Sequence, residues 1–226
     1  MTICVVIAAF NEAPTIREVA AGARRHVPDV CVVDDGSTDQ TASEAERGGA
    51  VVLRHERNLG KGQAVRTGLA YVLERPFTHV LLMDGDRQHD PADIPSLIDA
   101  ARSGAGDFVL GERPFNRGTM PASRFYINTI SSAVISRFFV GTRVADTQSG
   151  FRLIRCSLLR EVRLTARGYE IETEVLIKLR RKGAVIDRAP VRLRYDGARS
   201  KLRPIRDTTR TCFLAVRYRF FPERWA

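Results

Sequence analysis

Several features that mark membrane-spanning, secreted or zinc-binding proteins are missing from this sequence. No apolar run reaches the length of about 18 residues that a membrane-spanning helix needs, so we expect no such helix. The four cysteines, Cys4, Cys31, Cys156 and Cys212, are far apart and form no Cys-x-x-Cys pair, which argues against a zinc site or a disulfide framework. The chain opens directly on a strand-like run, so we expect no signal peptide. These absences predict a cytosolic protein with reduced cysteines in its core.

The chain of 226 residues is long enough for one α/β domain with a sizeable core, and short for two. With 44% hydrophobic and 27% charged residues, it has the composition of an ordinary globular protein. It contains no internal repeat and no low-complexity linker, so we predict a single domain over residues 1–226. The formal net charge of +10 suggests a polyanionic or membrane-surface partner, but it carries no information about the fold.

Strand-like and helical patterns alternate along the first half of the chain. Apolar runs predict strands at residues 3–9, 30–33, 50–53, 78–83 and 107–111. Helices are predicted at 14–26, at 91–102, from Ser37 or Thr38 as the cap to residue 47, and from the turn at 58–62 to residue 73. This alternation is typical of βαβ units around a mostly parallel sheet flanked by helices, which is an α/β fold.

The second half of the chain is more varied. We predict a helix at 121–139, a strand ending at residue 155, a helix at 170–182, a strand at 184–195 and a last helix from Pro204. Pro190 places the strand at 184–195 at a sheet edge or a bulge. The last helix has apolar residues at helical spacing and arginines largely on its other side. It is either a basic amphipathic helix for an anionic membrane surface or a helix packed on the core with a solvated basic face.

The stretch Leu81–His89 is the strongest candidate for a functional site. A buried strand is predicted to run directly into Asp84 and Asp86. Residues two apart in an extended segment point the same way, and Gly85 allows a tight turn, so the two carboxylates can converge on one cation. Carboxylate oxygens suit Mg²⁺ or Mn²⁺, which commonly bind one or two carboxylates together with the phosphates of a substrate.

Two further polar pairs follow predicted strands, Asn11-Glu12 after the first and Asp34-Asp35 after the second. Ligands of open α/β sheets bind beyond the carboxyl ends of the strands. Three acidic strand ends would repel one another unless a cation or a donor-rich ligand joined them. We therefore predict a functional cleft at this edge of the sheet.

The order and spacing of these motifs resemble glycosyltransferase family 2, which has the GT-A fold, and most closely its dolichol- or polyprenyl-phosphate sugar synthases. The resemblance extends over residues 3–210. Its motifs are Ala9-Phe10-Asn11-Glu12, Val33–Asp39, Asn58–Gly62 with Arg66 and Gly68, Asp84–His89, Asp146–Arg152, Tyr169–Glu174 and Ser200-Lys201-Leu202. It implies three parts within the one domain, which are a nucleotide-sugar-binding half at 1–112, an acceptor half at 113–203 and the basic amphipathic tail at 204–226.

The resemblance also implies roles for single residues. The nucleotide sugar would contact Ala9, Phe10, Asn11, Glu12, Asp34, Asp35, Lys61, Asp84 and Gly85, with Glu12 near the ribose and Asp34 accepting hydrogen bonds from the base. Asp84 and Asp86 would hold Mg²⁺ or Mn²⁺ on the diphosphate, and Gln88 would complete that site. Two departures are visible. Ala8 stands where the family usually has proline, and the Gln-x-x-Arg-Trp motif of processive polysaccharide synthases is absent, which argues against polymerisation.

The chemistry of transfer points to further candidates. A metal held by Asp84 and Asp86 would offset the charge that the leaving diphosphate gains. A phosphate acceptor is already an anion, so it needs a cationic pocket rather than a strong base. The candidates for this pocket are Arg113, Arg117, Arg124, Arg199, Ser200 and Lys201; of these we expect Arg113, Arg124 and Lys201, together with Asp86, to act in catalysis. A hydroxyl acceptor would instead need a base, for which Asp146 and Glu172 are the candidates, and His89 is close enough in sequence to reach the metal or a phosphate.

We predict an inverting sugar transferase that acts on a polyprenyl phosphate at the cytosolic, inner face of the membrane. Three alternatives remain, namely a transferase with a soluble hydroxyl acceptor, a sugar-nucleotide nucleotidyltransferase and a basic membrane- or nucleic-acid-binding module. A nucleotidyltransferase would need a glycine- and lysine-rich phosphate loop after the first strand, and residues 8–14 do not supply one. Nucleic-acid binding would not explain the acidic strand ends. GDP-mannose, UDP-glucose and UDP-N-acetylglucosamine are all compatible donors.

Overall fold

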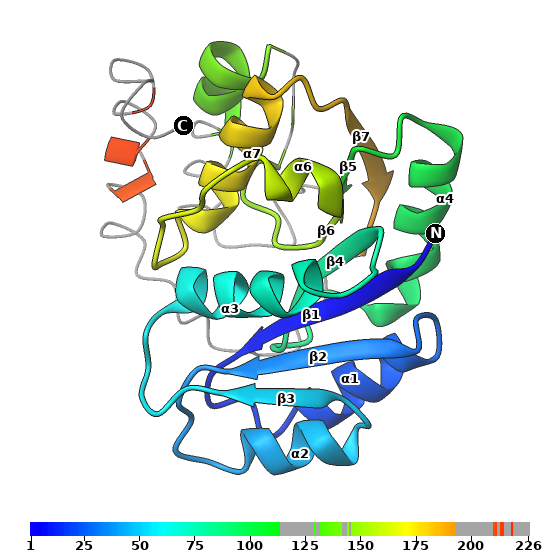
Figure 1. Ribbon diagram of the computed structural model, residues 1–226, viewed down its shortest axis with the longest axis vertical. Coiled ribbons are helices and arrows are strands. Elements are labelled where there is room, and N and C mark those ends of the chain that lie inside the picture. Colours follow the sequence, from blue (N-terminus) through cyan, green and yellow to red (C-terminus); the bar gives the residue numbers. More distant parts are fainter. Residues whose placement is uncertain are drawn as a thin grey trace.

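A computed structural model describes residues 1–113, 129, 132–141, 144, 146–192, 210, 211, 213, 214 and 218. A seven-stranded sheet runs through this part of the chain in the order β3-β2-β1-β4-β6-β5-β7 (Figure 1). The strands are β1 (Ile3–Ala9), β2 (Asp29–Asp34), β3 (Val51–Arg54), β4 (His79–Asp84), β5 (Phe108–Glu112), β6 (Arg152–Arg155) and β7 (Ile186–Pro190). Only β6 is antiparallel to its neighbours, β4 and β5, within these residues. The predicted mostly parallel α/β sheet is confirmed, and the reversed strand β6 is the feature that periodicity did not reveal.

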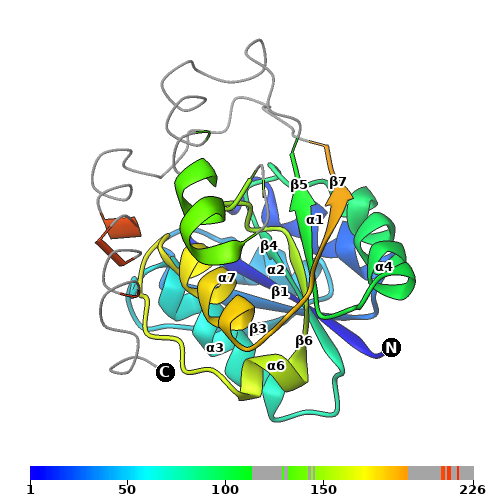
Figure 2. The ribbon, with the colours of Figure 1, turned by 90° about the horizontal axis from the view of Figure 1, so that it is seen from above.

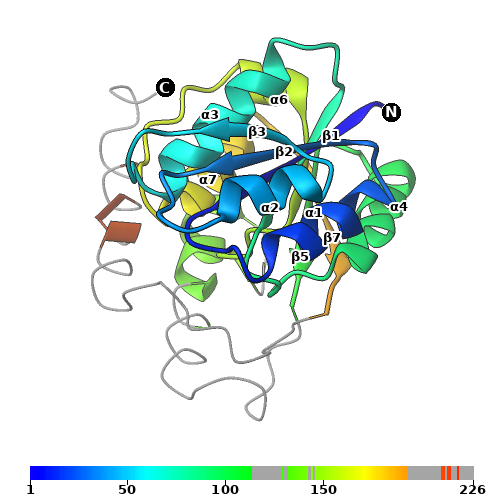
Figure 3. The same ribbon diagram turned by 90° about the horizontal axis from the view of Figure 1, so that it is seen from below.

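Helices cover both faces of the sheet. One face carries α3 (Lys61–Leu73), α6 (Cys156–Arg160) and α7 (Ile171–Arg181), as the view in Figure 2 shows. The other face carries α1 (Ile16–Arg24), α2 (Thr41–Arg47) and α4 (Ile94–Ser103), which Figure 3 shows from below. Cys4 and Val6 of β1 pack into the first core, while Val5 and Ile7 pack into the second. Burial on both faces explains why this strand is a continuous apolar run.

The start of α2 differs from the prediction. Neither Ser37 nor Thr38 caps the helix, because α2 begins at Thr41, whose backbone N–H donates to Asp39 Oδ1 at 3.0 Å. Ser37 Oγ instead accepts a hydrogen bond from the backbone N–H of Asn11 at 2.8 Å. This hydroxyl therefore joins the segment after β2 to the segment after β1.

Two other elements are shorter than predicted. The segment predicted as a helix from residue 91 begins with a 3₁₀ turn, η1 (Pro91–Asp93), which Asp90 caps by accepting the N–H of Ala92 at 3.0 Å. The helix α4 starts only after this turn. Of the strand predicted at 184–195, the structure describes residues 184–192, and within these the strand is β7, which ends at Pro190 and lies at the sheet edge, as the proline predicted.

The helices predicted at 121–139 and from Pro204 fall mostly outside the described residues. Within the first, η2 (Ser136–Val140) is a π-helical turn. None of the helices in the described ranges is long and apolar enough to cross a membrane. Cys4, Cys31 and Cys156 are buried free thiols, as predicted, and burial raises the pKa of Cys4 and of Cys31 to about 12. Cys212 lies outside the described residues.

Candidate active site

The carboxyl ends of three neighbouring strands form the base of the candidate site. Ala9 at the end of β1 pairs with Asp34 at the end of β2, and Ala8 pairs with Asp84 at the end of β4. The parallel register therefore brings the segments that begin with Asn11, Asp34 and Asp84 to one edge of the sheet. Their proximity follows from the sheet topology and does not depend on their separation in sequence.

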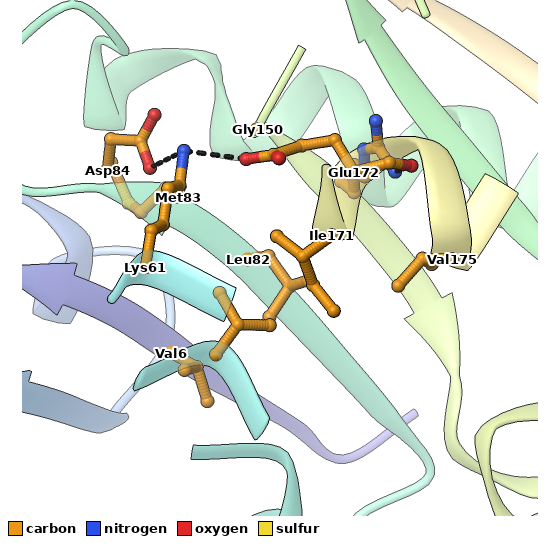
Figure 4. Close-up of a pocket in the computed structure, with 11 residues that line it drawn as sticks. Val6, Lys61, Leu82, Met83, Asp84, Gly150, Ile171, Glu172 and Val175 are labelled. Carbon is orange, nitrogen blue, oxygen red and sulfur yellow. Dashed lines mark hydrogen bonds and ion pairs between the residues drawn. The ribbon is translucent and has the colours of Figure 1, made fainter. Parts of the chain in front are cut away.

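Lys61 joins two carboxylates at this edge. Its Nζ lies 2.7 Å from Asp84 Oδ1 and 2.7 Å from Glu172 Oε1, so the first residue of α3 bridges β4 and α7 (Figure 4). The lysine and Glu172 are largely buried, and Asp84 is more exposed. The two carboxylates raise the pKa of Lys61 above its usual range, and the ammonium lowers the pKa of Asp84. Lys61 is therefore charged at neutral pH and holds the carboxylates together.

Glycines allow Lys61 to reach this position. Gly60 has a φ of +99°, and a Cβ on it would lie 2.4 Å from the carbonyl oxygen of Arg167. The backbone N–H of Gly62 donates to that same carbonyl at 2.9 Å. The turn before α3 thus packs directly on the backbone ahead of α7, and this close approach needs residues without side chains.

Asp86 carries a poorly balanced negative charge. Its Oδ1 accepts the backbone N–H of Gln88 at 3.0 Å. Burial, and after it the charge of Asp84, raises the pKa of Asp86 to about 6. A cation next to Asp84 and Asp86 would remove this repulsion, so the donor set fits a divalent ion. No cluster of three or more His, Cys, Asp and Glu side chains suitable for a metal occurs among the described residues, so the ion would also need oxygens from a ligand.

His89 supports the turn that contains Asp84. Its Nδ1 accepts the backbone N–H of Asp84 at 3.2 Å, and its ring stacks on Phe151 with centroids 5.1 Å apart. Burial lowers the pKa of His89 to about 4, so the ring is neutral at pH 7. Gly150 also packs tightly against Asp84, because a Cβ on Gly150 would lie 3.0 Å from Asp84 Oδ2. In this structure His89 therefore positions the backbone of Asp84 through a hydrogen bond. The sequence had suggested instead that His89 would contact the metal or a phosphate.

Asp34 presents an acceptor that the described part of the protein does not satisfy. Its side chain is fully buried, and Oδ1 accepts the backbone N–H of Ser37 at 3.0 Å. Arg54 Nε approaches Oδ2 to 3.3 Å, but without the alignment of a hydrogen bond, so Oδ2 is left without a hydrogen-bond partner among the described residues. An unsatisfied buried acceptor at the end of β2 suits an N–H donor of a nucleotide base.

Asp35 is engaged differently from its neighbour. Its Oδ1 lies 2.7 Å from His55 Nδ1 and accepts the N–H of Leu59, and its Oδ2 accepts the N–H of Gly60 at 2.8 Å. The other ring nitrogen of His55 lies 2.9 Å from Thr67 Oγ1. These bonds shape the turn before Lys61, and the nucleotide contact that the resemblance implied for Asp35 stays a prediction.

Asn11 and Glu12 lie between these carboxylates and α1. Asn11 has a φ of +50°, and its Oδ1 accepts the backbone N–H of Thr38 at 2.9 Å. The N–H of Glu12 donates to Thr41 Oγ1 at 2.8 Å, while the carbonyl of Gly85 accepts the hydroxyl of Thr15 at 2.8 Å. The first two bonds join the segment after β1 to the segment after β2, and the third joins it to the turn after β4.

Arg113 and Asp146 form a bidentate pair. Arg113 Nε donates to Asp146 Oδ2, and Nη2 donates to Oδ1 at 3.0 Å. Asp146 is fully buried. Because the guanidinium engages both carboxylate oxygens, this pairing does not arrange Asp146 as a general base.

Arg152 is a buried supporting residue next to the candidate site that the sequence analysis did not single out. Its buried guanidinium donates to the carbonyls of Thr147, Ser149 and Glu172. Burial lowers its pKa to about 10. Arg152 therefore clamps the 146–150 turn to the start of α7, and with them Gly150 and Glu172. Its place in the Asp146–Arg152 motif was the only sequence signal.

The remaining predicted residues divide into two groups. Ala9 is buried in the core, while Phe10 and Gln88 are partly exposed near the strand ends. The candidates Arg117, Arg124, Arg199, Ser200 and Lys201 lie outside the described residues.

Comparison with known proteins assigns the chain to a family. Residues 4–163 match the sequence model of Glycosyl transferase family 2. The chain belongs to this family. It is 32% identical over 211 residues to Glycosyltransferase AglJ of Haloferax volcanii, a match that covers 91% of this chain and 68% of that protein. It is 31% identical over 204 residues to the undecaprenyl-phosphate mannosyltransferase of Micrococcus luteus, covering 84% of this chain and 83% of the relative.

A solved structure shows the same fold. The glucosyl-3-phosphoglycerate synthase of Mycobacterium tuberculosis, in complex with Mn²⁺ and UDP-glucose, superposes with a TM-score of 0.71 at 25% identity. The match covers 96% of this chain and 78% of that chain. The family 2 protein is thus a glycosyltransferase with the GT-A fold, as the sequence motifs implied.

Proposed function

We propose that this glycosyltransferase is metal-dependent and moves a hexose, with inversion, from a nucleoside-diphosphate sugar to a polyprenyl phosphate. The observation that carries the proposal is the pair Asp84 and Asp86 at the end of β4, where the raised pKa of Asp86 marks an unbalanced negative charge. Mg²⁺ or Mn²⁺ is the cofactor that this pair suits.

Asp84, Asp86 and Gln88 would hold the metal. When bound, the ion supplies charge that stabilises the departing diphosphate. Lys61 lies next to the same site and would donate to a phosphate oxygen. The base would donate to Asp34 Oδ2, and the segment Ala9–Glu12 would contact the ribose and the base. Both uridine and guanosine remain compatible, and the mycobacterial synthase was solved with UDP-glucose.

The state of the candidate bases favours a phosphate acceptor. Asp146 is paired with Arg113, and Glu172 is paired with Lys61, so neither carboxylate is arranged as a strong base. A phosphate acceptor is already ionised at neutral pH and needs cations instead. Arg113 is the candidate among the described residues, and Arg117, Arg124, Arg199, Ser200 and Lys201 complete the proposed set. The name of the Micrococcus luteus relative gives undecaprenyl phosphate as its acceptor.

We also propose that the protein binds peripherally to the inner, cytosolic face of an anionic membrane. The formal charge is +10, and Val134, Phe138 and Phe213 are exposed large apolar side chains. Val134 and Phe138 are four residues apart, on one side of a helical segment. The three-part division at 1–112, 113–203 and 204–226 remains part of this proposal. The second candidate is a soluble acceptor, which the name of the mycobacterial synthase favours.

The first test is a thermal-shift panel with UDP, GDP and their sugars, each with Mn²⁺, Mg²⁺ or EDTA. A ligand that binds only the folded protein raises its melting temperature. We expect a shift with one nucleotide, dependent on metal and lost in Asp86→Ala but kept in Asp99→Ala, an exposed residue of α4. Transfer from the identified donor to undecaprenyl phosphate or to 3-phosphoglycerate then distinguishes the acceptors. Full transfer activity in EDTA would refute the metal-dependent mechanism.

A further inference from the structure

The ammonium group of Lys61 lies between the carboxylates of Asp84 and Glu172 in the candidate site. It contacts Asp84 Oδ1 and Glu172 Oε1 at 2.7 Å each (Figure 4), and it lies 5.3 Å from the centre of the Tyr169 ring. The second oxygen of Glu172 has no hydrogen-bond partner among the described residues. Lys61 is therefore the cation that balances Asp84 in the protein without a ligand.

A metal bound by Asp84 and Asp86 would compete with this lysine. Asp84 Oδ1 is engaged by Nζ, and Asp86 is only two residues away on the same turn. A unit positive charge and a divalent ion on one carboxylate repel each other strongly in a partly buried site. The metal alone must therefore either displace the ammonium group or bind weakly beside it.

Glu172 can hold the ammonium group of Lys61 when Asp84 does not. Glu172 keeps one oxygen on Nζ and has a second, unsatisfied oxygen within the same carboxylate. Lys61, Asp84 and Glu172 line one small cavity, together with the apolar residues Val65, Leu82 and Ile171. Nζ can thus leave Asp84 while it remains bound to Glu172.

We propose that Lys61 is a resident counter-ion that makes metal and nucleoside diphosphate bind cooperatively. Without nucleotide, its ammonium group occupies Asp84 and keeps metal affinity low. When the diphosphate binds, Nζ would donate a hydrogen bond to a phosphate oxygen, which would free Asp84 to hold the metal. The inference rests on the proposed metal-dependent function, and it adds the order in which the site is filled.

The test measures Mn²⁺ binding directly, from the electron paramagnetic resonance signal of free Mn²⁺, with Mn²⁺ alone and with UDP or GDP. We expect wild-type protein to bind Mn²⁺ weakly alone and at least about tenfold more tightly with the matching nucleotide. Lys61→Met is expected to bind Mn²⁺ alone at least about tenfold more tightly than wild type, with little further gain from nucleotide. Lys61→Gln keeps a hydrogen-bond donor without the charge, and it replaces Lys61→Met if that variant does not fold.

Two controls isolate the effect of the charge. Lys61→Arg retains the cation and is expected to bind Mn²⁺ alone as weakly as wild type. Lys178→Met removes another lysine of low exposure, paired with Glu174 on α7, and should leave Mn²⁺ binding unchanged. If wild type binds Mn²⁺ with nucleotide but the neutral variants gain no affinity for Mn²⁺ alone, the counter-ion inference is wrong and the proposed function stands. If wild type binds no Mn²⁺ even with either nucleotide, both are wrong.

Discussion

Replacing Asp86 by asparagine should inactivate the enzyme and at the same time stabilise its fold. The pKa of Asp86 is raised from 3.8 to about 6, chiefly by burial and secondly by Asp84. The folded protein therefore holds a proton there that the unfolded chain has already lost between about pH 4 and pH 6. Stability consequently falls as pH rises through this window, and the full penalty is present above it.

The size of the effect follows from the shift. At about 1.36 kcal/mol for each pKa unit, ionised Asp86 costs up to about 3 kcal/mol of folding free energy. Asparagine removes the charge and keeps an oxygen that can accept the N–H of Gln88. We therefore expect Asp86→Asn to raise the free energy of unfolding by about 1–3 kcal/mol at pH 8, and by roughly half as much at pH 5, which lies midway through the window.

Urea unfolding of both proteins in EDTA, at pH 5 and at pH 8, measures this difference. Asp99→Asn, on the exposed face of α4, is the matched control and should change stability little at either pH. A variant that is less stable than wild type at pH 8, or equally stabilised at both pH values, would show that Asp86 is not under electrostatic strain. Transfer activity should be lost in Asp86→Asn and retained in Asp99→Asn.

Three further changes test other parts of the site. Tyr218→Phe removes the 2.6 Å hydrogen bond from the phenol to buried Glu174 and should cost about 1.5–3 kcal/mol in urea unfolding, whereas Tyr71→Phe should cost little. Gly150→Ala would place a methyl group 3.0 Å from Asp84 Oδ2 and 3.3 Å from the His89 ring. It should weaken nucleotide-dependent Mn²⁺ binding at least about tenfold with a near-normal circular dichroism spectrum. Arg113→Lys breaks the bidentate pair with Asp146 and should reduce transfer more than nucleotide binding, as a comparison of turnover with thermal shift would reveal.

The strands that form the base of the site could be predicted, because the order of apolar and polar side chains identifies them. The apolar runs of β1, β2 and β4 identified strands buried on both faces, and the polar residues after them marked the carboxyl edge. The reversed strand β6 was not predictable in this way. It has only four residues, and its direction is set by pairing with β4 and β5 rather than by its own periodicity.

The contacts that hold the site residues in place could not be predicted from the sequence either. Asp35 and His89 looked like ligand-binding residues, yet both are engaged with backbone N–H groups. Almost every residue has a backbone N–H group, so the residue pattern does not predict which N–H a given side chain will bind. The bridge from Lys61 to Glu172 joins two helices that are distant in the chain, and it required the packing of α3 near α7.

The reversed strand has a consequence for how acceptors can change within this fold. Because β6 is antiparallel to both β4 and β5, the strands β5 and β7 end in the same direction as β4. Glu112 and Pro190 are paired at those ends, so β5 and β7 end side by side (Figure 2). Both ends point the same way as the end of β4, which carries Asp84. Under the division that we propose, acceptor specificity would change through residues that follow β5 and β7, while β1, β2 and β4 stay as they are.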